Sequence, residues 1–328
     1  MHEMESNKLV VERIVWLDWM KVLAILSIIW GHFFSSGYLY LYVFSVQVFC
    51  VISGFLYKKS PNWKTCLQKC FWQLFVPTVI MSLIMQMEDL VRCWYMGKEV
   101  YFPWIWYIKW LFLGNRWCMG PCWYFYSLMI VRLIMQLFPQ KRWLYVFLFL
   151  LFSFAVVSYS FLGIKVSNAI VNVLVFMPFF LFGVLLKPLK QVLDHLCFSI
   201  KLIVLCTSIA LVFVCGNVNG YVWMYLCEYG NSYILYIIGG LAGSAMLYVV
   251  SSWLSRLPYR QMIQTFSNGS ILIIGLHIII VRRLMELPNR IWGEDLALAV
   301  VVLFAFLPII RLSELFFPIL LGRRKLKG

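Results

Sequence analysis

Hydrophobic runs of similar length recur along the whole chain, and short segments carrying charge, proline or glycine separate them. An α-helix rises about 1.5 Å per residue, so about 20 apolar residues cross the hydrocarbon core of a bilayer. The pattern therefore predicts an all-α polytopic membrane protein with about ten transmembrane helices in one bundle. The predicted spans are 14–34, 38–57, 70–90, 121–138, 143–162, 168–187, 199–216, 231–251, 267–286 and 296–320.

One further apolar segment, YFPWIWYIKWLF at 101–112, is too short to span a bilayer. Trp and Tyr favour the membrane–water interface, so this segment predicts an interfacial or re-entrant helix. It belongs to the aromatic segment 88–120, the longest outer connection. Its side chains either stack on sugar rings or only anchor the protein at the interface, and the sequence leaves both interpretations open.

The first span differs from the others because it carries Asp18, Lys21 and His32. An ionisable side chain near the bilayer centre costs on the order of 3 kcal/mol or more. At about 100° per residue, Lys21 and His32 are three full turns apart with a small offset, and Asp18 pairs with Lys21 at i,i+3. The three polar groups form one stripe, which predicts a polar cavity inside the bundle.

Composition supports a membrane protein, since 63% of the 328 residues are hydrophobic and only 12% are charged. The net charge of +15 lies mainly between the spans, where it sets topology and attracts anionic lipid headgroups. We therefore expect membrane lipids, and no nucleic acid, as partners. The distribution of Lys and Arg predicts that both termini are cytoplasmic.

The chain is predicted to form one membrane domain at 13–322, flanked by a cytoplasmic tail at 1–12 and a basic tail at 323–328. The first span is long, contains charge and lacks a small-residue cleavage site, so we expect it to remain in the mature protein. The ten cysteines form no CxxC pair or zinc module, and no metal is expected. A disulfide between Cys93 and Cys118 is left open.

Several motifs resemble the membrane acyltransferase-3 family. LDWMKVLAILSIIWGH is similar to the opening motif, an Asp, a basic residue, ten residues and a His. FCVISGFLY at 49–57 resembles the aromatic-x-x-x-Ser-Gly-aromatic signature. GPCWYFYSLMIVRL at 120–133, PFFLFGVLLK at 178–187 and SNGSILIIGLHIII at 267–280 resemble three later helices. The resemblance runs from about residue 13 to 320, without the esterase-like domain that many members append.

The third predicted span departs from the family pattern. Members usually carry two basic residues before a proline, whereas LQKCFWQLFVP keeps Lys69 and Pro77 but has Trp72 and Gln73 near the second position. This departure weakens the expectation, taken from the family, that two basic residues at this position hold a phosphate group at the cytoplasmic side.

The resemblance implies an inner-membrane O-acyltransferase that moves an acyl group, expected to be acetyl, from cytoplasmic acetyl-CoA to a hydroxyl of a sugar or glycolipid acceptor at the outer side. His32 would be the catalytic base or a transient acyl acceptor. The remaining candidates are Lys21, Asp18 and Lys69 in the acyl-CoA channel, and Ser53, Gly54, Trp123 and His277 as motif and pocket residues. The acceptor and the oligomeric state are not predicted.

Each candidate also has a structural interpretation. Lys21 can pair with Asp18, His32 can be a hydrogen-bonded interfacial histidine, and His277 can bond a neighbouring helix. Gly54 can serve only to let two helices pack closely. A glycan or lipid transporter or flippase is the alternative function, because intramembrane charges also mark transport paths. No pair of broken helices in matching halves of the chain is expected, which disfavours an inverted-repeat transporter.

Overall fold

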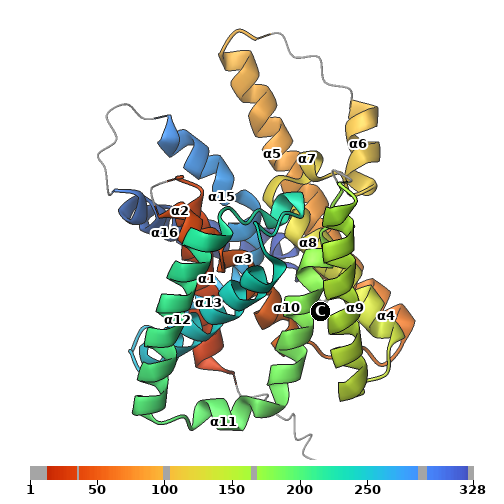
Figure 1. Ribbon diagram of the computed structural model, residues 1–328. Coiled ribbons are helices and arrows are strands. Elements are labelled where there is room, and N and C mark those ends of the chain that lie inside the picture. Colours follow the sequence, from red (N-terminus) through yellow and green to blue (C-terminus); the bar gives the residue numbers. More distant parts are fainter. Residues whose placement is uncertain (1–12, 35–36, 99–103, 164–167, 287–293, 324–328) are drawn as a thin grey trace, which may run out of the picture.

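The computed structural model describes residues 13–34, 37–98, 104–163, 168–286 and 294–323, and within them it is a helical bundle with no strand (Figure 1). The tails at 1–12 and 324–328 lie outside the described residues. The first half contains α1 Val15–Gly31, α2 Tyr38–Tyr42, α3 Ser45–Phe55, α4 Trp63–Cys70, the π-helix η1 Phe71–Phe75, α5 Val76–Tyr95, α6 Trp104–Phe112, α7 Arg116–Met119, η2 Gly120–Cys122, α8 Trp123–Leu137 and α9 Arg142–Phe161. The second half contains α10 Val173–Leu186, η3 Lys187–Leu189, α11 Lys190–Asp194, α12 Phe198–Asn219, η4 Met224–Leu226, α13 Tyr233–Leu254, α14 Arg260–Asn268, α15 Ser270–Met285, α16 Asp295–Phe316 and η5 Pro318–Leu321.

Eight helical segments of the described chain are long and apolar enough to cross a membrane, and the bent pair α14–α15 is a ninth if it counts as one span. α1 has 17 residues, whereas the shortest of the eight segments, Tyr38–Phe55, has 18. The nine segments and α1 lie where the hydrophobic runs predict helices, so the all-α polytopic fold is confirmed. Of the predicted segment 101–112, the described residues 104–112 form the short helix α6, which has nine residues.

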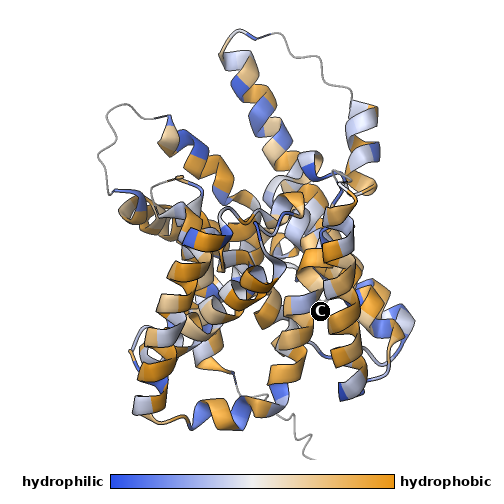
Figure 2. Cartoon of the chain, viewed as in Figure 1, coloured by the Kyte–Doolittle hydropathy of each residue, from blue (hydrophilic) through white to orange (hydrophobic). Residues whose placement is uncertain are grey.

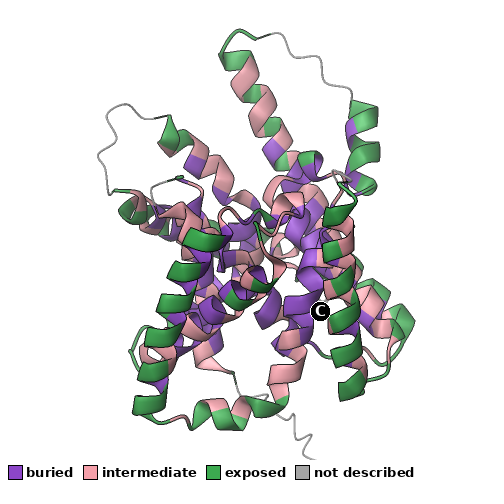
Figure 3. Cartoon of the chain, in the orientation of Figure 1, coloured by how far each residue is buried: buried purple, intermediate pink, exposed green. Residues whose placement is uncertain are grey.

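α1 lies in the interior of the bundle, packed against α2, α3, α13, α14, α15 and α16. Its residues Ala24, Ile25 and Ile29 are fully buried. Figure 3 shows buried residues in the middle of the bundle and exposed residues along α9 and α12, and Figure 2 shows that these outer helices are largely apolar. Apolar side chains therefore cover the periphery, where lipid is the solvent.

The predicted span at 267–286 is not a straight helix, which corrects the sequence interpretation. α14 begins earlier, at Arg260, and meets α15 at an angle of 78°. Gly269 stands at the break, where an added β-carbon would lie 2.3 Å from Cδ1 of Ile310. The break turns the last residues of α14 toward α1. Within the described residues it is the one bent pair of this kind, and no matching pair occurs in the other half of the chain.

The close crossing of α3 and α10 explains Gly54. A β-carbon on Gly54 would lie 1.8 Å from the carbonyl oxygen of Phe180, and one on Gly183 would lie 2.0 Å from that of Val51. Because only glycine lets two helix backbones approach this closely, Gly54 serves helix packing.

α4, η1 and α5 form one helical segment from Trp63 to Tyr95 that contains the π-turn Phe71–Phe75. The π-turn covers Trp72 and Gln73, where the chain departs from the family pattern. Single π-turns inside α-helices are frequent at functional sites. All ten cysteines are free, so Cys93 and Cys118 form no disulfide.

Candidate functional site

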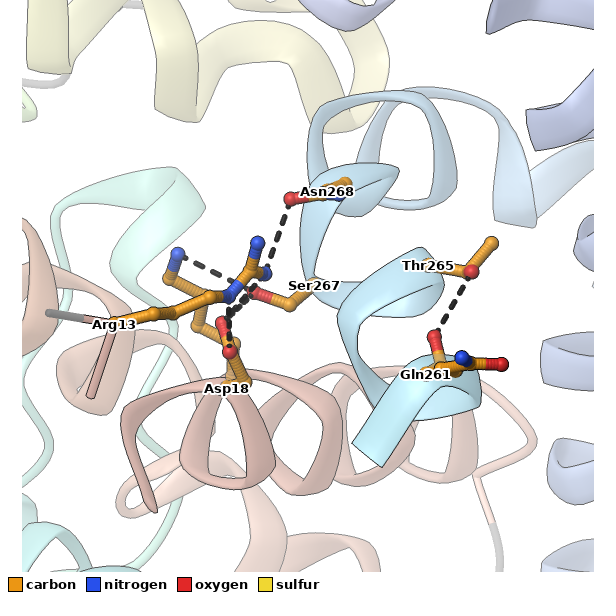
Figure 4. Close-up of polar contacts among 7 residues, drawn as sticks. Arg13, Asp18, Gln261, Thr265, Ser267 and Asn268 are labelled. Atoms are coloured by element: carbon orange, nitrogen blue, oxygen red, sulfur yellow. Dashed lines mark hydrogen bonds and ion pairs between the residues drawn. The ribbon is translucent and has the colours of Figure 1, made fainter. Parts of the chain in front are cut away.

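Asp18 forms an ion pair with Arg13 rather than with Lys21. Arg13 donates from Nε to one carboxylate oxygen at 2.6 Å and from a terminal nitrogen to the other at 3.0 Å. The same guanidinium reaches Asn268 Oδ1 at 3.1 Å, as Figure 4 shows. Two-point contacts of this kind fix geometry as well as charge, so Asp18 is neutralised locally. The alternative that the sequence left open for Lys21, an ion pair with Asp18, is not the contact that forms here.

Ser267 connects Lys21 with Asp18 through hydrogen bonds. Its hydroxyl donates to Asp18 Oδ1 at 2.6 Å and accepts a long hydrogen bond from Lys21 Nζ at 3.4 Å. Ser267 reaches α1 because α14 bends away from α15 directly after Asn268. Among the described residues, Lys21 thus has one weak neutral hydrogen-bond partner, and most of its hydrogen-bonding capacity remains for a ligand.

His32 lies at the opposite end of α1, where it follows the last helical residue, Gly31. Its Nδ1 shares a hydrogen bond of 3.3 Å with the hydroxyl of Tyr42. Eleven residues separate it from Lys21, or about 16 Å along the helix axis. α1 therefore carries a cation toward one end and has an imidazole directly after the other.

The structure brings His277 next to His32, with the two ring centroids 5.0 Å apart. His277 is buried on α15, and its Nδ1 lies 3.0 Å and 2.9 Å from the carbonyl oxygens of Ile273 and Ile274. Because carbonyls only accept, Nδ1 must carry a proton and Nε2 of the neutral ring is an acceptor. Nε2 has no hydrogen-bond partner among the described residues. Nδ1 therefore bonds to the backbone of α15, and Nε2 is available for a ligand.

Both histidines line a cavity of about 300 Å³. Aromatic rings form much of its wall, and its polar lining comes mainly from the histidines, Gln47, Ser45 and Arg282. Cavities of this size with few placed polar groups are typical of small-ligand sites. The aromatic lining residues are Phe34, Tyr42, Phe49, Trp117, Trp123, Tyr124, Trp223 and Tyr225.

Gln47 is a candidate that the sequence interpretation missed. It is fully buried on α3, its Nε2 donates to the carbonyl of Tyr42 at 3.3 Å, and its Oε1 has no partner in the part of the chain that the structure describes. An unsatisfied buried polar atom is costly, so it points to a ligand hydroxyl in the cavity. Its signal in the sequence is a lone amide in the apolar run 38–57.

The connection 220–232 covers the cavity with Val222, Trp223, Met224 and Tyr225. Arg116, buried at the start of α7, donates to Asn172 Oδ1 at 3.1 Å and to the carbonyl of Tyr225. Its guanidinium also lies 5.5 Å from the centre of the Tyr225 ring. Burial raises the pKa of Tyr225 to about 12 despite the opposing charge of Arg116. The cover is thus a fixed wall that presents a neutral phenol.

The remaining predicted residues have different positions. Ser53 lies beside Tyr124, with their oxygens 2.9 Å apart, and Tyr124 in turn donates to the carbonyl of Phe49 at 3.0 Å. Ser53 therefore joins α3 to α8. Trp123 is buried at the start of α8 and lines the cavity. Lys69 is exposed on α4, and the structure does not bring it to the Asp18 cluster.

Arg282 and Arg283 at the end of α15 pair with the carboxylates of α5. Arg282 lies 2.9 Å from Asp89, and Arg283 pairs with Glu88 and also with Glu286. These ion pairs join the end of α15 to the outer part of α5. Arg282 also lines the cavity, so one cation lies next to the histidines.

One of the comparisons with known proteins gives a match. The model of the acyltransferase domain family matches residues 14–313, nearly the whole chain. No curated protein and no solved structure gives a significant match.

Proposed function

Because this chain belongs to the acyltransferase-3 family, we propose that it moves an acetyl group from cytoplasmic acetyl-CoA to a hydroxyl of a glycan or glycolipid at the outer side of the inner membrane. The family makes it a membrane acyltransferase. The donor, the acceptor and the orientation are our proposal, and the bias of Lys and Arg supports cytoplasmic termini.

The Lys21 end of α1 is the proposed entrance of the donor. An ammonium group whose carboxylate neighbour is already neutralised by Arg13 suits the phosphates of coenzyme A. The pantetheine arm is long and thin, which fits the distance of about 16 Å from Lys21 to His32. Asp18 then acts through Arg13 and Ser267, as a positioning group for the donor channel.

His32 is the proposed general base. In its reactive tautomer, Nδ1–H donates to the Tyr42 hydroxyl and the Nε2 lone pair is available for chemistry. Nε2 takes the proton of the acceptor hydroxyl while the oxygen attacks the thioester carbonyl. The tetrahedral intermediate collapses, the C–S bond breaks, and the coenzyme A thiolate takes the proton from the imidazolium. The products are the acetyl ester and free coenzyme A.

The acceptor is proposed to bind in the cavity at His32. Sugar rings stack on aromatic side chains such as Trp123, and sugar hydroxyls donate to buried acceptors. His277 Nε2 and Gln47 Oε1 are two such acceptors without a protein partner. They would orient the acceptor so that the reacting hydroxyl faces His32, and orientation of this kind lowers the barrier by removing a bimolecular entropy cost.

The adjacent ring pair of His32 and His277, with an unpartnered Nε2 in a lined cavity, is the observation that carries the proposal. The test uses inverted native membrane vesicles and acetyl-labelled acetyl-CoA, with transfer of label to membrane glycan as the readout. We expect His32→Ala to lose on the order of 100-fold or more in transfer with normal insertion. Near-normal transfer by His32→Ala would exclude the mechanism.

The same vesicles distinguish the transport alternative. A flippase or transporter would move a glycan or lipid across the membrane while the label stays on coenzyme A. The structure offers one bent span and no matching second one among the described residues, so an inverted repeat of broken helices is not supported.

A further inference from the structure

A second cavity, of about 500 Å³, lies between α1, α3, α10, α12 and α13, at the end of the bundle where α1 begins. Its lining includes Trp16, Met20, Phe55, Leu186, Val204 and Tyr248, and neither Lys21 nor His32 belongs to it. It is therefore separate from the proposed donor and acceptor sites. It is partly open, and α12, which flanks it, is a span with most of its residues exposed on the outside of the bundle.

Polar side chains at the rim of this cavity form hydrogen bonds within the protein. α11 joins the lower ends of α10 and α12 in Figure 1 and contributes Leu193 to the lining. Trp16 Nε1 donates to Asp194 at 2.9 Å, and the Tyr248 hydroxyl donates to the carbonyl of Leu193. The interior is thus almost entirely hydrocarbon. Apolar cavities exclude water, so this one suits an alkyl chain.

Lys201 supplies a cation at the same end. It is 6% exposed at the start of α12 and makes no hydrogen bond or ion pair with the described residues. Val204 and Ser208 follow it at i+3 and i+7 and line the cavity, so Lys201 lies on the same helix face, one turn nearer the end of the bundle.

The charged neighbours of Lys201 do not neutralise it. They are Arg256 and Asp194, and Asp194 is already bound by Lys190 at 2.6 Å and by Trp16. A buried ammonium without a partner is unfavourable in a membrane protein unless an anion completes the site. Two cations beside an apolar chamber are complementary to an amphiphile with an anionic head.

We propose that this cavity binds one acyl chain of an anionic phospholipid from the leaflet on the α11 side, with the phosphate held by Lys201 and Arg256. Basic pockets between transmembrane helices are the usual form of such sites. The bound chain fills the space between α10 and α12, and the headgroup supplies the missing charge for Lys201. The proposal is independent of the acyltransfer mechanism.

The test is native mass spectrometry of the detergent-purified full chain after titration with phosphatidylglycerol or phosphatidylcholine. We expect one phosphatidylglycerol per chain, bound in preference to phosphatidylcholine. Lys201→Gln should weaken this binding about tenfold, the usual effect of losing a charge-assisted contact. Lys64→Gln, which removes the same charge from an exposed site on α4, should leave it unchanged.

A second variant tests the chamber itself. Ala245→Phe places a ring in the cavity and should exclude the acyl chain while Lys201 stays in place. Equal binding of both lipids, or unchanged phosphatidylglycerol binding in Lys201→Gln, would overturn the proposal. Displacement of the bound lipid by stoichiometric palmitoyl-CoA would also overturn it, because the chamber would then be a site for a long-chain acyl donor.

Discussion

Arg13 binds Asp18 with two hydrogen bonds, at 2.6 Å and 3.0 Å, so the carboxylate of the first span has a cationic partner other than Lys21. From their i,i+3 spacing, the sequence left open that Lys21 pairs with Asp18. Spacing allows that contact, but Arg13 has a planar guanidinium that matches a carboxylate at two points, and an ammonium cannot. Lys21 is left with the Ser267 hydroxyl at 3.4 Å.

This arrangement predicts that Lys21 serves the donor. Lys21→Ala should weaken acetyl-CoA binding by about tenfold or more, because a charge-assisted contact contributes roughly 1.5–3 kcal/mol. Lys21→Arg should be largely tolerated, since it keeps the charge. Isothermal titration of the purified protein with acetyl-CoA measures the effect.

The Asp18→Asn/Lys21→Met double variant provides the control. If Lys21 only neutralised Asp18, removal of both charges would restore donor affinity and stability. We expect no restoration, because Arg13 is the partner of Asp18. Wild-type affinity in the double variant would mean that Lys21 is structural and that the donor enters elsewhere.

The two ring nitrogens of His277 have separate roles, and the variant His277→Asn keeps one role and removes the other. The asparagine amide nitrogen stands near the position of Nδ1 and can still donate to the carbonyls of Ile273 and Ile274. The acceptor atom Nε2 is lost. We expect wild-type thermal stability with KM for the acceptor raised up to about tenfold, the effect of one neutral hydrogen bond.

Steady-state kinetics with varied acceptor, together with a thermal unfolding curve, check this prediction. His277→Ala, which loses both atoms, should be less stable as well as less active. If His277→Asn keeps the wild-type KM, the residue serves only to tie α15 to itself.

The sequence identified the spans because bilayer thickness imposes one length on every apolar run, and it placed His32 and Lys21 on one face because helix geometry is fixed. It missed the bend at Gly269, where the side chain of Ile310, 41 positions later, leaves no room for a β-carbon. It also missed Gln47, whose importance follows from an unpartnered atom next to a cavity. Such partners come from distant elements, and one chain read linearly does not reveal them.

The topology prediction rests on the distribution of Lys and Arg, and the structure separates the two ends of α1. Trp16 bonds α11 at the start of α1, whereas His32 shares its cavity with Val222 and Tyr225 beyond the other end. With ten spans and cytoplasmic termini, the connection 220–232 is outside. Reporter fusions at Gly328 and within that connection should therefore report opposite compartments, and the same compartment for both would contradict the count of ten.

Gly54 offers a test of structure against chemistry in a motif that the family resemblance singles out. Gly54→Ala pushes α3 away from the Phe180 carbonyl, because its β-carbon would otherwise lie 1.8 Å from that oxygen. Overpacking of this kind costs about 1–3 kcal/mol, and rigid backbone on the facing helix leaves little room to relax. The midpoint of thermal unfolding in detergent should fall by several degrees.

Gly37→Ala is the matched control, since nothing lies within 4 Å of the added carbon and its φ is −88°. It should leave the midpoint nearly unchanged. Acetyl transfer per folded molecule should fall in Gly54→Ala only as far as α3 moves Gln47, which lies on the same helix. A fully active Gly54→Ala protein with an unchanged midpoint would contradict this prediction. It would show that α3 and α10 separate easily and that another contact holds Gln47 in the cavity wall.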